Sequence, residues 1–417
     1  MNYYNNTKNK EWLYLIAFLS PILGLIESIV YYRKPIAKNL FWLFCIFYGM
    51  VHIYMPDWGI GEVGNADSLR YANYLTVMHD TNMSWEGLSY SFYNSEGGNV
   101  DIYIPVLTFI VSRFTGNPHI LFMIFAFVFG FFYSRNIWCI INHIKTKYDT
   151  ITVILILSFA LATPIWQING VRMWTALHIF LYGILPYLFS NNNIRKLPWC
   201  FASVLVHFSF IIPCAIVIIF HFIPKKTLPL FMIFIFSCFI QELDIAIIRE
   251  KLFSLGFSAF ENRIDIYTSE TAVSGMQHVN EKLSAHVILA KALSKYLHYI
   301  LIVICYFSIY KRKDVLTNHL FCFTTLFYSF ANIAACVPSG GRFVILAQMI
   351  TDILTIICHI SNTNIKRSFM ICSIALIYPI IFSIRTGMDF WGLNLLITNP
   401  ITCWFISDNI PIISFIK

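Results

Sequence analysis

Long apolar stretches alternate with short basic clusters along the whole 417-residue chain. Windows of about 20 apolar residues predict membrane spans near residues 13–31, 40–55, 118–141, 150–165, 173–189, 198–223, 228–240, 298–310, 319–337, 343–360, 368–384 and 390–406. Several of these runs are apolar on every face, which suits helices in lipid and does not suit spanning strands. The pattern predicts an all-α, polytopic transmembrane helical bundle of about 11–13 spans, with residues 1–417 forming a single integral membrane domain.

The basic clusters predict how this bundle is oriented. They are short, contain almost no acidic residues, and comprise Arg33/Lys34/Lys38, Lys145/Lys147, Arg195/Lys196, Lys225/Lys226, Lys311/Arg312/Lys313 and Lys366/Arg367. The positive-inside rule places all of them in the cytoplasm. Two longer polar segments, 57–101 and 241–297, then become periplasmic loops; the first has seven carboxylates against the single Arg70. We also expect span 13–31 to be retained, because a basic cluster follows it directly and no cleavage site is seen.

The number of crossings between cytoplasmic clusters must be even, and two intervals need an exception. Only one apolar run, 198–223, separates Arg195/Lys196 from Lys225/Lys226, and it carries His207, Ser209 and Pro213 in its middle. We expect this run to enter and return as a broken or re-entrant element; one ordinary helix that departs from the charge rule is the alternative. Between Lys38 and Lys145, the even count requires that one of the apolar runs does not cross the membrane. The run 102–113 is too short to span it and is the natural candidate.

Composition supports a membrane protein without a bound cofactor. The chain is 58% hydrophobic and 12% charged, against about 25% charged in soluble domains. The net charge of +8 comes from clusters between spans, which indicates membrane anchoring rather than nucleic-acid binding. The cysteines lie inside apolar runs and are expected to pack the core. There is no Walker loop, GxSxG, HExxH or DxD motif, so we expect neither a metal nor another cofactor.

Three arginines are candidates for binding an anionic ligand. Arg172 follows Asn169-Gly170 at the predicted outer end of a helix, and Arg342 follows Gly340-Gly341 in a short outer turn. A guanidinium presents a fork of donors that matches phosphate oxygens. The alternative for Arg172 is an interfacial side chain that reaches to lipid headgroups. Arg385 is a third candidate, although an ion pair with Asp389 would explain it equally well.

His207 and two polar segments complete the candidate set. A histidine in an apolar run is a functional candidate in a membrane protein, as a general base or as an acid that stabilises a leaving phosphate; a histidine bonded to a neighbouring helix is the alternative. Asp67, Arg70 and Tyr71 in the first outer loop suit sugar binding, and Arg263 and Tyr267 in the second repeat that chemistry. A solvated loop would have the same composition.

The ordered set of motifs resembles the EpsG/Wzy family of bacterial exopolysaccharide and O-antigen polymerases. The resemblance rests on Asp67 and Tyr71 after the second span, on NGVRMWTAL around Arg172, and on FASVLVHFSFIIP around His207. Arg342 and the loop with Arg263 and Tyr267 match more loosely. The sequence departs from the family where Met173-Trp174 stands in place of a glutamine, and in its long first outer loop.

The resemblance implies a glycosyltransferase at the periplasmic face of the bacterial inner membrane. Such a polymerase joins oligosaccharide repeat units carried on undecaprenyl diphosphate. Arg172 and Arg342 would stabilise the lipid-diphosphate leaving group without a metal, and His207 or Asp67 would take the acceptor proton. Undecaprenyl-diphosphate-linked glycans, membrane lipid and a chain-length regulator are the implied partners.

Four other functions remain possible from the sequence. An O-antigen ligase would share the substrate and differ in its acceptor. A glycan-lipid flippase would favour symmetric bundles and cations at the membrane centre, which the sequence does not indicate. A membrane-bound O-acyltransferase would use a buried histidine such as His207 but would leave the outer arginines unexplained. A structural subunit of an envelope complex would need none of these side chains.

Overall fold

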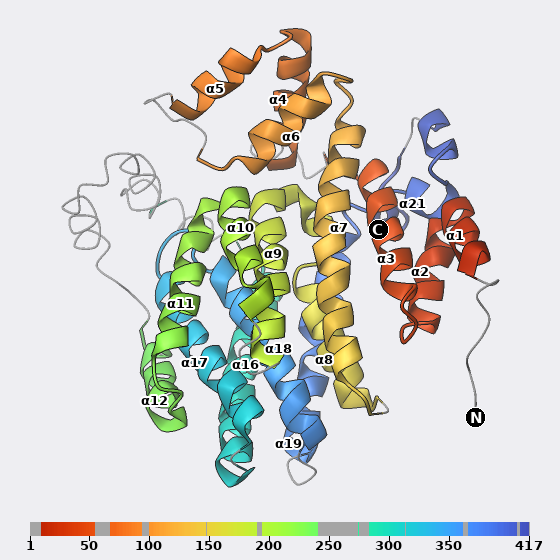
Figure 1. The fold of residues 1–417 in the computed structure, drawn as a ribbon. Coiled ribbons are helices and arrows are strands. Elements are labelled where there is room, and N and C mark those ends of the chain that lie inside the picture. The colour runs from red at the N-terminus through yellow and green to blue at the C-terminus, as the bar shows by residue number, and fades with distance from the viewer. Residues whose placement is uncertain are drawn as a thin grey trace.

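The computed structural model describes residues 10–54, 67–93, 100–146, 148–189, 194–240, 274, 283–312, 314–361, 366–406 and 409–416. This described part is all-helical, as predicted, apart from one isolated bridge between Gly392 and Pro411. Its α-helices, shown in Figure 1, are α1 Lys10–Leu19, α2 Pro21–Val30, α3 Ala37–Met50, α4 Asp67–Asp80, α5 Trp85–Tyr93, α6 Tyr103–Ser112, α7 Pro118–His143, α8 Thr150–Ala162, α9 Val171–Phe189, α10 Pro198–Val206, α11 Ile211–Phe222, α12 Thr227–Ser237, α16 Ala285–Arg312, α17 Val315–Ala334, α18 Arg342–Ser361, α19 Lys366–Ala375, α20 Ile377–Gly387 and α21 Asn394–Ile397. Short 3-10 turns are η3 Ile165–Gly170, η4 Ile194–Lys196, η5 Phe208–Phe210, η7 Thr402–Phe405 and η8 Ile412–Phe415.

Five helical stretches are long and apolar enough to cross a membrane, at 118–143, 150–189, 285–310, 342–361 and 366–387 within the described residues. The stretch 150–189 contains a reversal, because His178 Nε2 lies 3.0 Å from Thr163 Oγ1. In one straight helix these residues would be about 22 Å apart. The chain is a helical membrane protein, and it reverses direction between α8 and α9.

Helix α7 organises the bundle by packing against α3 on one side and α9 on the other (Figure 1). It starts at Asn117, whose side chain accepts a hydrogen bond from the His119 N–H, and Pro118 occupies the first turn, where a missing N–H is harmless. Gly49 of α3 lets the two backbones approach: a Cβ there would lie 2.4 Å from the Phe122 carbonyl oxygen. The crossing of α3 and α7 therefore requires glycine.

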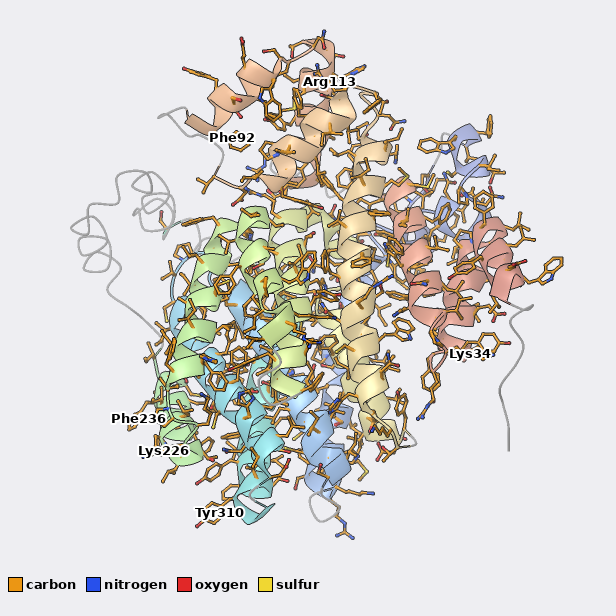
Figure 2. All side chains as sticks on the ribbon, viewed as in Figure 1. Lys34, Phe92, Arg113, Lys226, Phe236 and Tyr310 are labelled. Atoms are coloured by element: carbon orange, nitrogen blue, oxygen red, sulfur yellow. The ribbon has the colours of Figure 1, made fainter. Side chains whose placement is uncertain are left out.

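The basic clusters gather at one end of the bundle. The Arg33 guanidinium donates to the Thr146 carbonyl, and the Asn318 amide donates to the Lys225 carbonyl. Lys34 and Lys226 lie on the lower side in Figure 2, whereas Arg113 and Phe92 lie on the upper side. We call the lower side the basic end and the other the site end. This arrangement is the one that a common cytoplasmic location for the clusters requires.

The apolar run 198–223 is broken at His207, as predicted. Helices α10 and α11 are 9 and 12 residues long, too short to cross a membrane alone. The Cys214 thiol lies 3.0 Å from the Cys200 carbonyl oxygen, although one straight helix would separate these residues by about 21 Å. The chain therefore turns back at His207 and forms a helical hairpin.

Runs 13–31 and 390–406 do not form the single spanning helices that were predicted for them. Run 13–31 forms the separate helices α1 and α2, which fold against each other at Pro21; a Cβ on Gly24 would lie 2.6 Å from the Ala17 Cβ. Run 390–406 contains only α21 and η7. Asparagine side chains interrupt the helix there: Asn399 accepts from the Ile401 and Thr402 N–H groups, and Pro400 follows it. Hydropathy does not register these backbone breaks.

The polar segments also differ from their predicted boundaries. In the first, α4 and α5 are helical and pack with α6 over the site end of the bundle (Figure 1). The 10-residue α6 lies there instead of crossing. The second segment was predicted to be a loop through residue 297, but α16 begins at Ala285, because 285–297 is apolar enough to extend the helix. Residues 241–273 and 275–282 of that segment lie outside the described residues.

Candidate functional site

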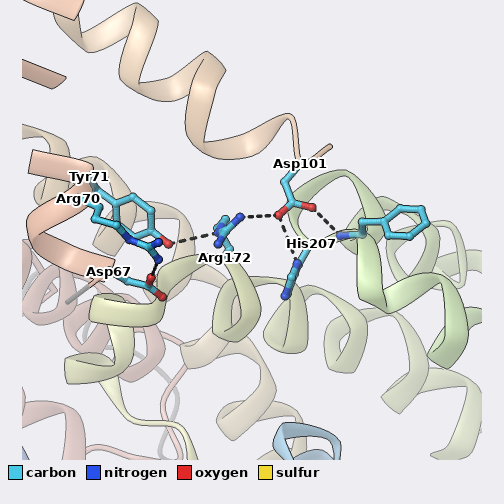
Figure 3. A network of polar contacts seen from close by, with 7 residues as sticks. Asp67, Arg70, Tyr71, Asp101, Arg172 and His207 are labelled. Atoms are coloured by element: carbon cyan, nitrogen blue, oxygen red, sulfur yellow. Dashed lines mark hydrogen bonds and ion pairs between the residues drawn. The ribbon is translucent and has the colours of Figure 1, made fainter. Parts of the chain in front are cut away.

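Arg172 lies in the first turn of α9, where residues from two other parts of the chain meet it. Its Nε is 3.2 Å from the Tyr71 hydroxyl of α4, and its Nη1 is 3.0 Å from Asp101 Oδ2. Asp101 lies just before α6. Figure 3 shows the guanidinium between these two groups. Arg172 and Tyr71, predicted separately from the sequence, are therefore in contact.

Asp101 connects Arg172 to His207. The His207 Nδ1 lies 3.3 Å from the same Oδ2, and the Phe208 N–H donates to Oδ1 at 2.8 Å. The side chains of Asp101 and His207 are 8% and 12% exposed, and that of Arg172 is 32% exposed. We call Tyr71, Asp101, Arg172 and His207 the Asp101 network (Figure 3).

The break in the 198–223 hairpin creates the places where Asp101 binds. His207 ends α10 in an extended conformation, with φ −148° and ψ 112°. That conformation ends α10, and the N–H of the next residue, Phe208, points to the carboxylate. A second bond, from the Ile102 N–H to the Leu205 carbonyl at 3.1 Å, holds the start of α6 against the same break.

Electrostatics favour the ionised form of Asp101. Burial alone would raise the pKa of this carboxyl, but the His207 imidazole, the Phe208 N–H and the Arg172 guanidinium outweigh it. The pKa of Asp101 is consequently held below its ordinary value. A carboxylate that stays charged keeps a cation and an imidazole aligned at the site end.

Asp67 and Arg70 pair with each other beside this network. They lie in the first turn of α4 and form an ion pair, and the Arg70 side chain is 61% exposed. Figure 3 shows them next to Tyr71. Asp67 is thus neutralised by its neighbour, whereas His207 is held by a buried carboxylate. Both predicted proton acceptors lie at the site end.

Arg342 lies near the hairpin break, but neither Arg342 nor Arg385 forms a described contact with the Asp101 network. Arg342 is exposed at the start of α18, and the next residue, Phe343, packs its ring 6.0 Å from that of Phe210 in η5. Arg385 forms an ion pair with Asp389 at 3.2 Å, which is the alternative considered from the sequence. Arg263 and Tyr267 lie outside the described residues.

Asp101 was not singled out from the sequence, although it joins the two strongest candidates. It is the last of seven carboxylates in an acidic segment, so its composition does not distinguish it. One signal was present: Asp101 directly precedes the apolar run 102–113. A carboxylate next to an apolar run lies close to the apolar part of the membrane, where a charged side chain needs a bonding partner.

The fold and this network define a class: a helical membrane protein with a partly buried arginine, histidine and aspartate at the end of the bundle opposite its basic clusters. Searches with family models, curated proteins and solved structures find no match to the chain.

Proposed function

We propose that the protein is a membrane glycosyltransferase of the EpsG/Wzy polymerase type. It joins oligosaccharide repeat units carried on undecaprenyl diphosphate, at the periplasmic face of the bacterial inner membrane. The observation that carries the proposal is the sharing of one carboxylate, Asp101, by Arg172 and His207 at the end opposite the basic clusters. A polymerase of this kind needs a phosphate-binding cation and a base side by side at the membrane surface.

His207 is the proposed general base. In this proposal Nδ1, 3.3 Å from the Asp101 carboxylate, carries the hydrogen, so that Nε2 keeps the lone pair that accepts a proton. Asp101 also stabilises the imidazolium that forms after proton transfer. Asp67 is the weaker base because Arg70 already compensates its charge.

Arg172 is the proposed partner of the leaving group. The acceptor hydroxyl oxygen attacks the anomeric carbon of the donor glycan, its proton passes to His207 Nε2, and the bond from that carbon to the diphosphate breaks. Charge then develops on the diphosphate, and a nearby guanidinium lowers the energy of that state, by about 3–4 kcal/mol for a donor of this type. Arg342, exposed at the start of α18, adds a second cation from the same end.

Tyr71, Arg70 and the aromatic residues of α4 supply the proposed sugar contacts. Tyr71 is held by Arg172, so its ring position is linked to that of the cation. Arg385 contributes only when its ion pair with Asp389 opens. Arg263 and Tyr267 remain candidates for the rest of the sugar site, and a chain-length regulator remains a proposed partner.

Glycan analysis in a strain that lacks the native gene tests the proposal. Arg172→Ala should abolish long polymer and leave single repeat units on their lipid carrier, with normal amounts of inserted protein. Arg113→Ala is the matched control, because Arg113 lies at the same end, stacks on Phe109 and bonds Asn82 outside the network. Long polymer retained on undecaprenyl diphosphate would instead indicate a ligase, and repeat units confined to the cytoplasmic leaflet would indicate a flippase. Wild-type chain length in Arg172→Ala would overturn the proposal.

A further inference from the structure

A second ionisable pair lies in the interior of the bundle, on helices that take no part in the Asp101 network. His298 is near the middle of α16 and Asp352 is near the middle of α18, and both helices are long and apolar enough to cross a membrane. Their side chains are 2% and 1% exposed, and His298 Nε2 lies 3.1 Å from Asp352 Oδ1. Ionisable residues at mid-membrane depth are rare and characteristic of proton or ion pathways.

The hydrogen bonds around the pair define its proton content. His298 Nδ1 lies 2.6 Å from the Ser294 carbonyl oxygen, and a carbonyl can only accept, so Nδ1 carries a hydrogen. The contact between Nε2 and Oδ1 then holds one proton when the pair is neutral, on either atom. The Ser158 hydroxyl of α8 also bonds the Asp352 carboxyl. The pair is therefore a single-proton site in an apolar core.

A cavity approaches this pair from the basic end. Its volume is about 90 Å³, and its lining comes from the last turns of α16 and α18 and the start of α17: Ser308, Ile309, Asp314, Thr317, Cys358 and Ser361. Apolar atoms make up most of its surface, but Ser308, Asp314, Thr317 and Ser361 supply polar atoms that a water molecule can bond. The cavity thus places water-binding groups at the basic end of the α16–α18 contact.

Thr355 and Cys305 lie between the cavity and the pair. The Thr355 hydroxyl is 3.9 Å from the Cys305 thiol across the α16–α18 contact. Thr355 is three residues from Asp352 and three from Cys358 on the same helix, so each step rises by about 4.5 Å. A hydroxyl that can donate and accept therefore stands between the cavity and the carboxyl.

Several other titratable side chains surround the pair. They are Tyr299 and Cys305 on α16, Tyr328 on α17 and Cys372 on α19, while Tyr378 of α20 contacts His286 near the other end of α16. Lys295 lies over the Tyr299 ring, at 5.8 Å, and toward Cys238 of α12. The sequence of α8 contains no titratable side chain. Among these groups the His298–Asp352 contact is the one suited to hold an exchangeable proton.

We propose that His298 and Asp352 form a proton-binding site that exchanges its proton with water in the cavity at the basic end. A proton from that water passes by way of the Thr355 hydroxyl to the Nε2–Oδ1 contact, and the proton already there leaves by the reverse path. The pair returns to its neutral state after each exchange. This inference does not depend on the glycosyltransferase proposal.

Infrared spectroscopy of the purified full-length protein after transfer to D₂O tests the inference. The carboxyl and imidazole bands of the pair are assigned by difference against Asp352→Asn and, independently, His298→Gln. We expect these bands to shift at least tenfold faster than the amide bands of the spanning helices. Thr355→Val, which keeps the volume and removes the hydroxyl, should slow the shift at least tenfold.

Two controls make the result decisive. Thr324→Val removes an equally buried hydroxyl on α17 that bonds its own helix at 2.8 Å, as Thr355 does, and it should leave the exchange unchanged. Asp149→Asn removes a different histidine–aspartate pair, Asp149 with His359 at 2.7 Å, and should not affect the assigned bands. Exchange as slow as that of the spanning amides, or equal rates in Thr355→Val and Thr324→Val, would overturn the inference and leave the pair a structural contact.

Discussion

The carboxylate of Asp101 accepts a hydrogen bond from the Phe208 N–H at 2.8 Å, across 107 residues of sequence. The same carboxylate contacts Arg172 and His207 through its other oxygen. One side chain therefore holds the start of α6, the first turn of α9 and the broken hairpin together. The arrangement of the candidate site depends on this carboxylate more than on either of the groups it positions.

Asp101→Asn should disassemble the network while keeping the shape of the side chain. The amide can still accept from Phe208, but its NH₂ group faces donors on Arg172 or His207, and the negative charge is lost. We expect the free energy of unfolding to fall by about 1–3 kcal/mol and polymer formation to fall at least tenfold. Thermal unfolding in detergent and glycan chain length measure the two effects.

Asp67→Asn is the matched control for that substitution. It removes a carboxylate that pairs with an arginine at the same end, but the partner Arg70 is largely exposed, and exposed pairs contribute about 0–1 kcal/mol. Its unfolding temperature should stay near that of the wild type. Equal losses in the two variants would show that Asp101 has no special structural role.

The contribution of Asp101 to stability should disappear in acid. Its pKa is lowered in the folded protein from the ordinary 3.8, so the unfolded chain takes up the proton first as the pH falls. The stabilisation is fully present above the ordinary value and is lost as the pH drops through the lower, folded value. The difference in unfolding free energy between wild type and Asp101→Asn should be constant down to about pH 4 and shrink below it. A difference that shrinks already near neutral pH would contradict this assignment.

The sequence identified those site residues whose chemistry differs from that of their neighbours along the chain. Arg172 stands at a helix start and His207 in an apolar run, so each is conspicuous without knowledge of the fold. Asp101 is one acid among seven in its segment, and only the fold brings it to the break after α10. The pair of His298 and Asp352 was missed for the same reason, because each is a single polar residue in a span and only packing brings them together.

The helices were predictable where apolar length alone determines them. Helix α7 is close to its predicted span, and the break at His207 followed from charge parity and local polarity. The spans 13–31 and 390–406 failed because a hydropathy average does not see Pro21 start a second helix or Asn399 cap a turn. Backbone hydrogen bonds of this kind depend on individual side chains and not on mean apolarity.

Gly49→Ala should destabilise the contact between α3 and α7. The new Cβ would lie 2.4 Å from the Phe122 carbonyl oxygen and 2.9 Å from the Met123 Cα, so the helices must separate. We expect the free energy of unfolding to fall by about 1–3 kcal/mol, although alanine favours a helix over glycine by about 1 kcal/mol. Thermal unfolding in detergent provides the measurement.

Gly341→Ala is the corresponding control, because a Cβ there meets no atom within 4 Å. It should change the free energy of unfolding by less than about 1 kcal/mol. If both alanine variants behave alike, the close approach of α3 and α7 is not what Gly49 provides.

Cysteines introduced at the basic end and at the site end should react with a thiol reagent from opposite sides of the membrane. Lys226 and Lys34 lie on one side of the molecule and Arg113 on the other (Figure 2), and the positive-inside rule assigns the basic side to the cytoplasm. In a chain whose partly exposed cysteines are replaced by serine, Arg113→Cys should react with a membrane-impermeant thiol reagent added to intact spheroplasts. Lys226→Cys should react only after the membrane is opened. Reversed labelling would place the Asp101 network in the cytoplasm, where a polymerase acting on periplasmic repeat units could not use it. Labelling of both cysteines from outside would mean that the membrane does not separate the two ends of the described bundle.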